Sequence, residues 1–178
     1  MMSHRNGLNT RRTALSAVLA ALSLLLLWLA CLVPSGRLGM VALAGLVPAA
    51  AVVSAGLISG FLCYGTCGLL GLLLVPDKGA AALYLLFFGL YPMLKSAIER
   101  LGRYPLEWAL KLLFFNSVLS IFWFSLRTLF LPFLPEALAG RSWPLYPVGN
   151  VAFLTYDFGF SKVISFYMER IDRAVRPK

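Results

Sequence analysis

Polar and aromatic side chains interrupt long apolar runs in this sequence, and they are the residues best placed to carry chemistry. Those that we single out are Tyr84, Asn116, Trp123, Arg127, Asn150 and Asp157. An aspartate at the centre of a membrane-spanning helix costs about 2.5–3.5 kcal/mol. Asp157 therefore needs a partner, water or a ligand. We take this set as candidate substrate-binding residues.

Helical spacing places several of these residues on common faces. One stripe has intervals of four, three and four, and contains Asn116, Ser120, Trp123 and Arg127. A second comprises Asn150, Leu154, Asp157 and Ser161. Two interpretations of Asp157 stay open, a structural ion pair with Lys162 or Lys111, or ligand binding.

The cationic residues near the predicted helix ends also have two interpretations. Arg127 either snorkels to the lipid headgroups or lines an outward-facing pocket that takes an anionic group. We expect Lys95 and Lys111 to snorkel to the inner surface. Most tyrosines and tryptophans fit an interfacial aromatic belt.

Enzyme signatures are missing from the sequence. His4 is the single histidine, which excludes a H-E-x-x-H zinc site and any histidine-based triad. Cys63 and Cys67 lie four apart without a neighbouring histidine or carboxylate, so we expect them to be packing residues. We expect no catalytic activity, metal or cofactor.

The composition points to a membrane environment. Hydrophobic residues make up 60% of the 178 residues and charged residues 13%, against about 45–50% and about 25% in soluble domains. The net charge is +9, but the basic residues cluster between apolar runs. We therefore expect contacts with anionic lipid rather than with nucleic acid.

The apolar runs predict six membrane spans. The expected fold is therefore an all-α polytopic membrane helix bundle. Residues 38–75 contain no charge and would form one helix of about 57 Å, far longer than the roughly 30 Å hydrocarbon core. We therefore predict a turn near Ser54–Gly56. The predicted spans are 13–33, 38–54, 57–75, 80–98, 106–131 and 148–171, between a disordered basic arm, 1–12, and a basic tail, 172–178.

The distribution of Lys and Arg predicts the orientation. With six spans and a cytoplasmic amino terminus, eleven basic residues fall in inner segments. These are Arg5, Arg11, Arg12, Lys95, Arg100, Arg103, Lys111, Arg170, Arg173, Arg176 and Lys178. The outer segments hold Arg37, Lys78, Arg127 and Arg141. This positive-inside bias places both ends in the cytoplasm. Treating residues 38–75 as one span would give five spans and spoil the bias.

The layout resembles the substrate-binding S component of energy-coupling factor (ECF) vitamin transporters. Those are small bacterial proteins of six helices with both ends in the cytoplasm. Ala17 and Ala21 match the A-x-x-x-A face by which the family's first helix docks on the transmembrane coupling protein. A short Pro/Gly loop follows that helix, as in the family, and the Gly-rich segment from Gly56 to Lys95 is similar in character.

The resemblance implies a binding subunit in a bacterial cell membrane. A vitamin or similar small molecule would bind in the outer half among the last three helices, and ATPase subunits would supply energy. Nickel and cobalt are poor candidates, because the amino terminus lacks the Met-His pattern. Two alternatives stay open: a membrane assembly or regulatory protein without a small ligand, and a proton-coupled carrier that uses Asp157.

Overall fold

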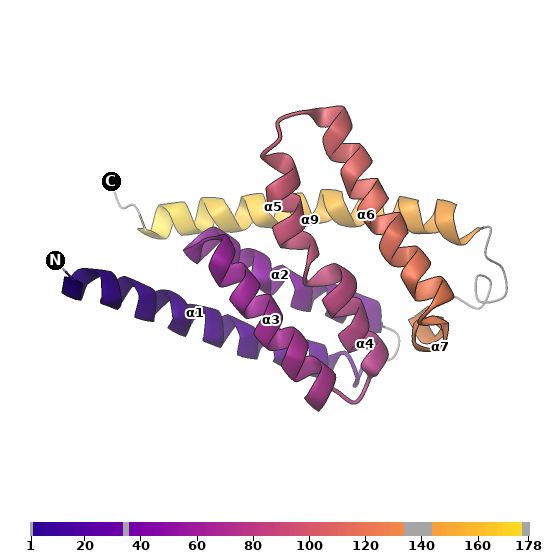
Figure 1. Ribbon diagram of the computed structural model, residues 1–178, viewed down its shortest axis with the longest axis horizontal. Helices are drawn as coiled ribbons and strands as arrows, with labels where there is room; N and C mark the ends of the chain where they lie inside the picture. Colours follow the sequence, from indigo (N-terminus) through magenta and orange to yellow (C-terminus); the bar gives the residue numbers. More distant parts are fainter. Residues whose placement is uncertain (1, 34–35, 134–143, 176–178) are drawn as a thin grey trace. The chain divides into compact units, whose positions relative to one another are not determined.

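The structure, a computed structural model, describes residues 2–33, 36–133 and 144–175, and these contain helices and no strand (Figure 1). Among them, five segments are long and apolar enough to cross a membrane. They are Arg12–Leu29, Arg37–Ala55, Leu57–Leu74, Lys78–Glu99 and Tyr104–Phe124. The chain is therefore an all-helical protein with several candidate membrane-spanning helices. It divides into two compact units, residues 1–97 and 98–178.

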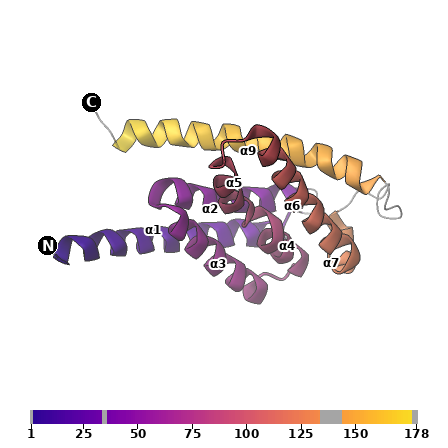
Figure 2. The same cartoon turned by 45° about the horizontal axis from the view of Figure 1, so that its top comes forward.

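The first unit is built on three helices, α1 (Met2–Leu29), α2 (Arg37–Ala55) and α3 (Leu57–Leu74). They pack against one another, as both ribbon views show (Figures 1 and 2). The break between α2 and α3 falls at Gly56, where φ is +93°. A side chain is strained at that φ, so the uncharged stretch turns where glycine permits it.

Helix α1 begins at Met2, whereas we expected an irregular arm over residues 1–12. No proline interrupts this polar segment, so the helix continues beyond the apolar run. Ala20 packs inward with Val47, Ala51 and Cys63.

The fourth candidate span, Lys78–Glu99, belongs to the first unit up to residue 97 and is the most enclosed of the five. In an apolar stretch of 18 residues, 67% are buried in this span, against 39% in α2 and 33% in α3. It comprises α4 (Lys78–Leu83), a π-helical turn η2 (Tyr84–Phe88) and α5 (Tyr91–Glu99). The Asp77 carboxylate caps its start by accepting hydrogen bonds from the backbone N–H groups of Gly79 and Ala80, at 2.9 and 3.1 Å.

The π-helical turn is stabilised by two features of its neighbours. The Gly89 N–H donates to the Tyr84 carbonyl at 2.7 Å, and the Tyr64 hydroxyl donates to the Leu85 carbonyl at 2.8 Å. The widened turn lies against Gly45 of α2, where an added Cβ would come within 2.5 Å of the Phe88 carbonyl oxygen. Glycine is therefore required for this close approach.

The second unit contains α6 (Tyr104–Phe124), α7 (Arg127–Phe130), the short turn η3 (Leu131–Phe133) and α9 (Leu145–Val175). Pro105 lies in the first turn of α6, where its missing N–H is not needed. The helix ends at Phe124, so Arg127 begins a separate helix instead of continuing a span to residue 131. The expected outer loop, with Arg141, lies largely outside the described residues.

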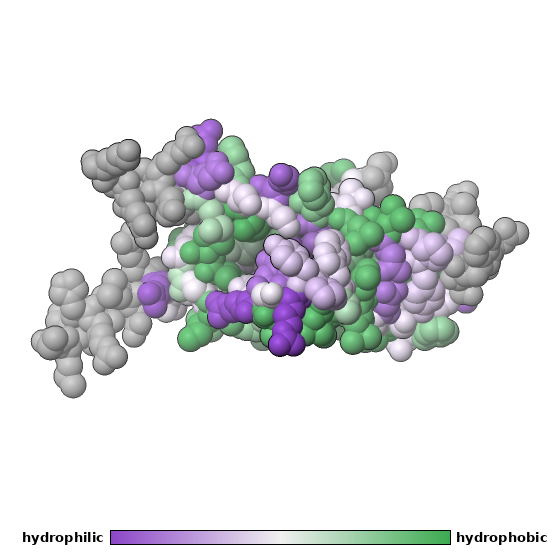
Figure 3. Space-filling view, turned by 90° about the horizontal axis from the view of Figure 1, so that it is seen from above, coloured by the Kyte–Doolittle hydropathy of each residue, from purple (hydrophilic) through white to green (hydrophobic). Residues whose placement is uncertain are grey.

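Helix α9 has 31 residues and is not among the five candidate spans. Its sequence mixes apolar side chains with Asn150, Asp157, Lys162 and Arg170, which lowers its hydropathy. Elsewhere, large apolar side chains such as Leu73 and Ile58 are 76% and 79% exposed. Figure 3 shows apolar side chains interleaved with hydrophilic ones on the visible face.

Candidate polar site between α6 and α9

Polar side chains of α6 and α9 meet along one antiparallel interface, which we call the polar seam. It comprises Lys111, Asn116 and Ser120 on α6 and Tyr146, Asn150 and Asp157 on α9. As residue numbers rise along α6, those of their partners fall along α9, so the two helices run in opposite directions. Both helices belong to the second unit, so the seam is a feature of that unit alone.

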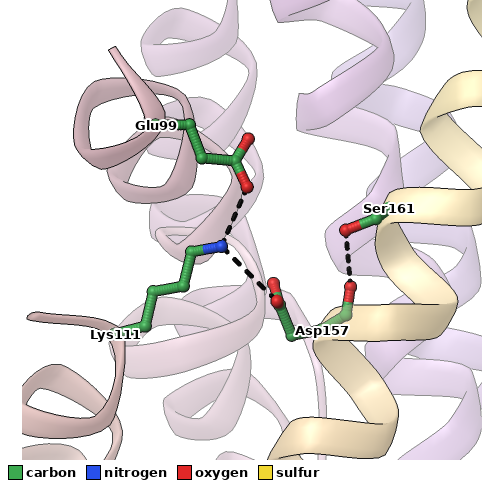
Figure 4. Close-up of polar contacts among 4 residues, drawn as sticks. All are labelled: Glu99, Lys111, Asp157 and Ser161. Atoms are coloured by element: carbon green, nitrogen blue, oxygen red, sulfur yellow. Dashed lines mark hydrogen bonds and ion pairs between the residues drawn. The ribbon is translucent and has the colours of Figure 1, made fainter. Parts of the chain in front are cut away.

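At one end of the seam a lysine lies between two carboxylates (Figure 4). Lys111 Nζ is 2.8 Å from Glu99 Oε1 and 3.4 Å from Asp157 Oδ2. The side chains of Lys111 and Asp157 are each 6% exposed, whereas that of Glu99 is 45% exposed. The buried pair is thus neutral, and Glu99 gives Lys111 a second partner at the edge of the unit.

Midway along the seam, Asn116 and Asn150 form a reciprocal pair. Each side-chain amide donates to the other's oxygen, at 3.0 and 3.1 Å. Each also donates to the backbone carbonyl four residues earlier, at 2.8 Å. Both hydrogens of each amide are therefore used within the protein.

The third contact joins Ser120 and Tyr146, whose hydroxyl oxygens are 2.9 Å apart. Ser120 donates its single hydrogen to the carbonyl of Asn116 at 2.7 Å. Tyr146 is therefore the donor to Ser120. This places a tyrosine hydroxyl one helical turn from the paired amides.

Apolar packing holds the two helices close beside these contacts. The rings of Phe115 and Phe153 stack with centroids 4.7 Å apart. A Cβ added at Gly149 would lie 3.2 Å from a methyl of Leu119. A small residue at 149 therefore allows the approach that lets the short Asn116 and Asn150 side chains reach each other.

The structure brings together three of the residues predicted to bind substrate, Asn116, Asn150 and Asp157. Trp123 lies further along α6 and is 7% exposed. The exposed Arg127 guanidinium lies 4.8 Å from the Trp123 ring centre. Leu154 is partly exposed at 39%, so Phe153 takes the inward position that we expected of Leu154.

Tyr84 belongs to the first unit and lies in a different polar cluster. Its hydroxyl is 3.2 Å from that of Ser23, which donates to the Ala44 carbonyl at 2.9 Å. Cys67 donates its S–H to Ser23 at 3.3 Å. Tyr84 is fully buried. Through Ser23 on α1, this cluster joins α2, α3 and the π-helical turn.

Sequence reasoning missed two members of these clusters and misjudged a third. Glu99 and Ser23 were not singled out, because nothing in a single sequence shows which distant helices meet. Lys111 was expected to snorkel to the inner surface or to pair with Asp157; it is 5% exposed, so the first expectation is wrong, and it pairs with Asp157. Glu99 lies twelve residues before Lys111 and Asp157 lies 46 residues after it, and only the fold brings such distant acids to the lysine.

The small-residue face proposed for partner docking is exposed. Ala17 and Ala21 both face outward from α1, while Ser16 and Ala20 face inward. Thr10, Thr13, Ala14 and Ala17 line a shallow hollow of about 470 Å³ on the same helix. The small residues of α1 thus serve both internal packing and an open surface.

The seam contains amide, hydroxyl, ammonium and carboxylate groups, and these groups pair with one another or with backbone carbonyls. No group of three or more potential metal ligands occurs among the residues that the structure describes. Comparisons with models of protein families, with curated proteins and with solved structures give no match to this chain.

Proposed function

We propose that this chain is the membrane-embedded substrate-binding subunit of an ECF-type uptake transporter in a bacterial cell membrane. In this proposal α9 is the sixth span, both ends lie in the cytoplasm, and the substrate is a vitamin or a similar small molecule. A transmembrane coupling protein docks on the α1 face with Ala17 and Ala21. ATPase subunits on other chains supply the energy.

The observation that carries the proposal is the meeting of Asn116, Asn150 and Asp157 on one α6–α9 interface. These residues come from distant parts of the sequence, and each costs free energy in a membrane unless it is paired. Two apolar helices need no such set to pack. A reciprocal amide pair can exchange its internal hydrogen bonds for those of a ligand at little net cost, and a substrate would bind by this exchange.

Co-purification from native membranes tests this function. The proposal predicts ATPase subunits and a coupling protein in the purified complex, and a small molecule released on denaturation and identified by mass spectrometry. A bundle that purifies without ATPases and without a small molecule contradicts it.

A matched pair of variants then locates the site. In Asn116→Leu/Asn150→Leu both amides are replaced together, so no unpaired polar group is left and the fold is preserved. We expect this variant to lose the bound molecule. The control, Ser117→Leu, changes an exposed position on the same helix and should retain it. Retention in the double variant would place the site elsewhere.

One observation favours a second function, that of an assembly or regulatory protein without a small ligand. The amides of Asn116 and Asn150 already satisfy each other, and Lys111 already pairs with Asp157. Such internal pairing is explained by the stability of the helix bundle, without any ligand. This alternative predicts an unrelated membrane partner in the same co-purification.

The longer of the two Lys111 contacts favours a third function, a proton-coupled carrier. At 3.4 Å, Asp157 is held less tightly than Glu99 at 2.8 Å. The Asp157→Asn variant should then fold but lose transport. Unchanged uptake by this variant would rule out the proton-coupled function.

A further inference from the structure

Helix α9 carries a stripe of alternating aromatic and cationic residues outside the polar seam. Phe158, Lys162, Phe166 and Arg170 follow one another at intervals of four, and all are exposed. We call these four residues the cationic stripe. Phe158 and Phe166 are 66% and 60% exposed. A stripe at this spacing forms one continuous helix face.

Each cation of the stripe lies over the ring one turn before it. Lys162 Nζ is 5.4 Å from the centre of Phe158, and Arg170 Cζ is 5.3 Å from that of Phe166. These cation–π contacts hold both charges against the helix instead of leaving them free in solvent. The positive groups are therefore positioned in advance for an anion that approaches from the side.

The length of α9 places the stripe at a membrane boundary. Its 31 residues extend about 46 Å at 1.5 Å per residue, which exceeds the hydrocarbon core of about 30 Å. Between Leu145 and Ser161 the only charged residue is Asp157, which is buried, whereas charges recur from Lys162 onward. The hydrocarbon boundary therefore falls near Lys162.

The charge of this end of the chain selects an anionic partner. From Lys162 to the carboxyl terminus the sequence holds Lys162, Arg170, Arg173, Arg176 and Lys178. The acids of the same segment are Glu169 and Asp172. The net charge of this segment is therefore positive, and the anionic headgroups of a cytoplasmic leaflet attract such segments.

We propose that the cationic stripe binds an anionic phospholipid of the inner leaflet. The headgroup phosphate lies beside Lys162, Arg170 lies about 12 Å further along the helix among the headgroups, and the acyl chains lie along Phe158 toward the bilayer centre. The inner-leaflet assignment rests on the proposed crossing of α9. The binding itself depends on the stripe alone.

Native mass spectrometry of the purified protein with phosphatidylglycerol or phosphatidylcholine tests this site. We expect tighter binding of phosphatidylglycerol by the natural protein. Each cation near a lipid surface contributes about fivefold in affinity, so Lys162→Gln/Arg170→Gln should weaken phosphatidylglycerol binding by about 25-fold. Phosphatidylcholine binding should not change.

A matched control removes the same charge elsewhere. Arg37→Gln/Lys78→Gln neutralises two cations that the proposed orientation places on the outer side of the membrane, and we expect it to weaken binding less than threefold. A second variant, Phe158→Leu/Phe166→Leu, keeps both cations but removes the rings and should weaken binding by an intermediate factor. This variant also tests the site if the charge variant does not fold.

Two results would overturn the inference. One is equal phosphatidylglycerol affinity in the stripe variant and the control. The other is displacement of phosphatidylglycerol by inorganic phosphate at the same concentration, which would show that the stripe binds free anions and not lipid. A wrong assignment of α9 as a span would leave the lipid affinities unchanged and would appear only in a topology measurement.

Discussion

At the residue scale, the polar groups of the α6–α9 seam were recognisable in the sequence, and Lys111 was one of the two lysines considered as a partner of Asp157, but the pairing of the two asparagines was not foreseen. Asp157 and Asn150 stand out because each lies in a predominantly apolar run. The reciprocal bonds of Asn150 with Asn116, 34 residues away, depend on helix register and on the close approach at Gly149. A single sequence shows neither the relative register of two helices nor how closely they approach, so Asn116 and Asn150 were found but their pairing was not.

The buried ion pair gives a prediction at this scale. Lys111→Met leaves Asp157 buried without its cation, and breaking such a pair costs about 3–5 kcal/mol. The double variant Lys111→Met/Asp157→Leu removes both charges and should recover most of that loss. Unfolding in mild detergent, followed by circular dichroism, measures the free energies.

The control for this cycle is Glu99→Gln, since Glu99 is half-exposed and water replaces its contact with Lys111. It should lower stability by less than about 1 kcal/mol. If the effects of Lys111→Met and Asp157→Leu simply add in the double variant, the two side chains are not coupled, and our account of the seam is wrong.

At the element scale, helix positions followed from apolar run lengths, whereas local irregularities did not. The turn at Gly56 was expected, because an uncharged stretch of that length cannot be one span. The π-helical turn at Tyr84–Phe88 was not, since it depends on tertiary contacts with Gly45 and Tyr64. The early end of α6 at Phe124 was missed too, as apolar residues continue on both sides of it.

The contact between α2 and the π-helical turn gives a second prediction. Gly45→Ala should lower stability by about 1–3 kcal/mol, because its Cβ would lie 2.5 Å from a backbone oxygen. Gly65→Ala is the matched control on α3, where an added Cβ meets nothing within 4 Å. Thermal unfolding of both should show a loss only for Gly45→Ala, and equal melting temperatures would contradict the packing.

The Tyr64 hydroxyl gives a third prediction. Tyr64→Phe removes its hydrogen bond to the Leu85 carbonyl and should cost about 0.5–1.5 kcal/mol. Tyr104→Phe is the control, because that side chain is 80% exposed. The same unfolding measurement separates them. An unchanged Tyr64→Phe protein would mean that the π-helical turn needs no support from α3.

At the scale of the whole molecule, composition predicted a polytopic helical membrane protein, and the described residues contain five helical segments long and apolar enough to cross a membrane. The number of spans is the open step, because α9 is less apolar than the other long helices. Its polar residues explain this difference, because Asn150 and Asp157 face α6 and lower the mean hydropathy of the whole helix.

The side of the membrane on which the chain ends tests the six-span arrangement most directly. Reporter fusions can be placed after Arg103, after Phe133 and at the carboxyl terminus, using green fluorescent protein, active in the cytoplasm, and alkaline phosphatase, active outside. The six-span arrangement and the alternative in which α9 does not cross both predict an inner position after Arg103 and an outer one after Phe133. Six spans predict fluorescence and no phosphatase activity at the carboxyl terminus. Phosphatase activity there would mean that α9 does not cross, and would contradict the proposed binding subunit.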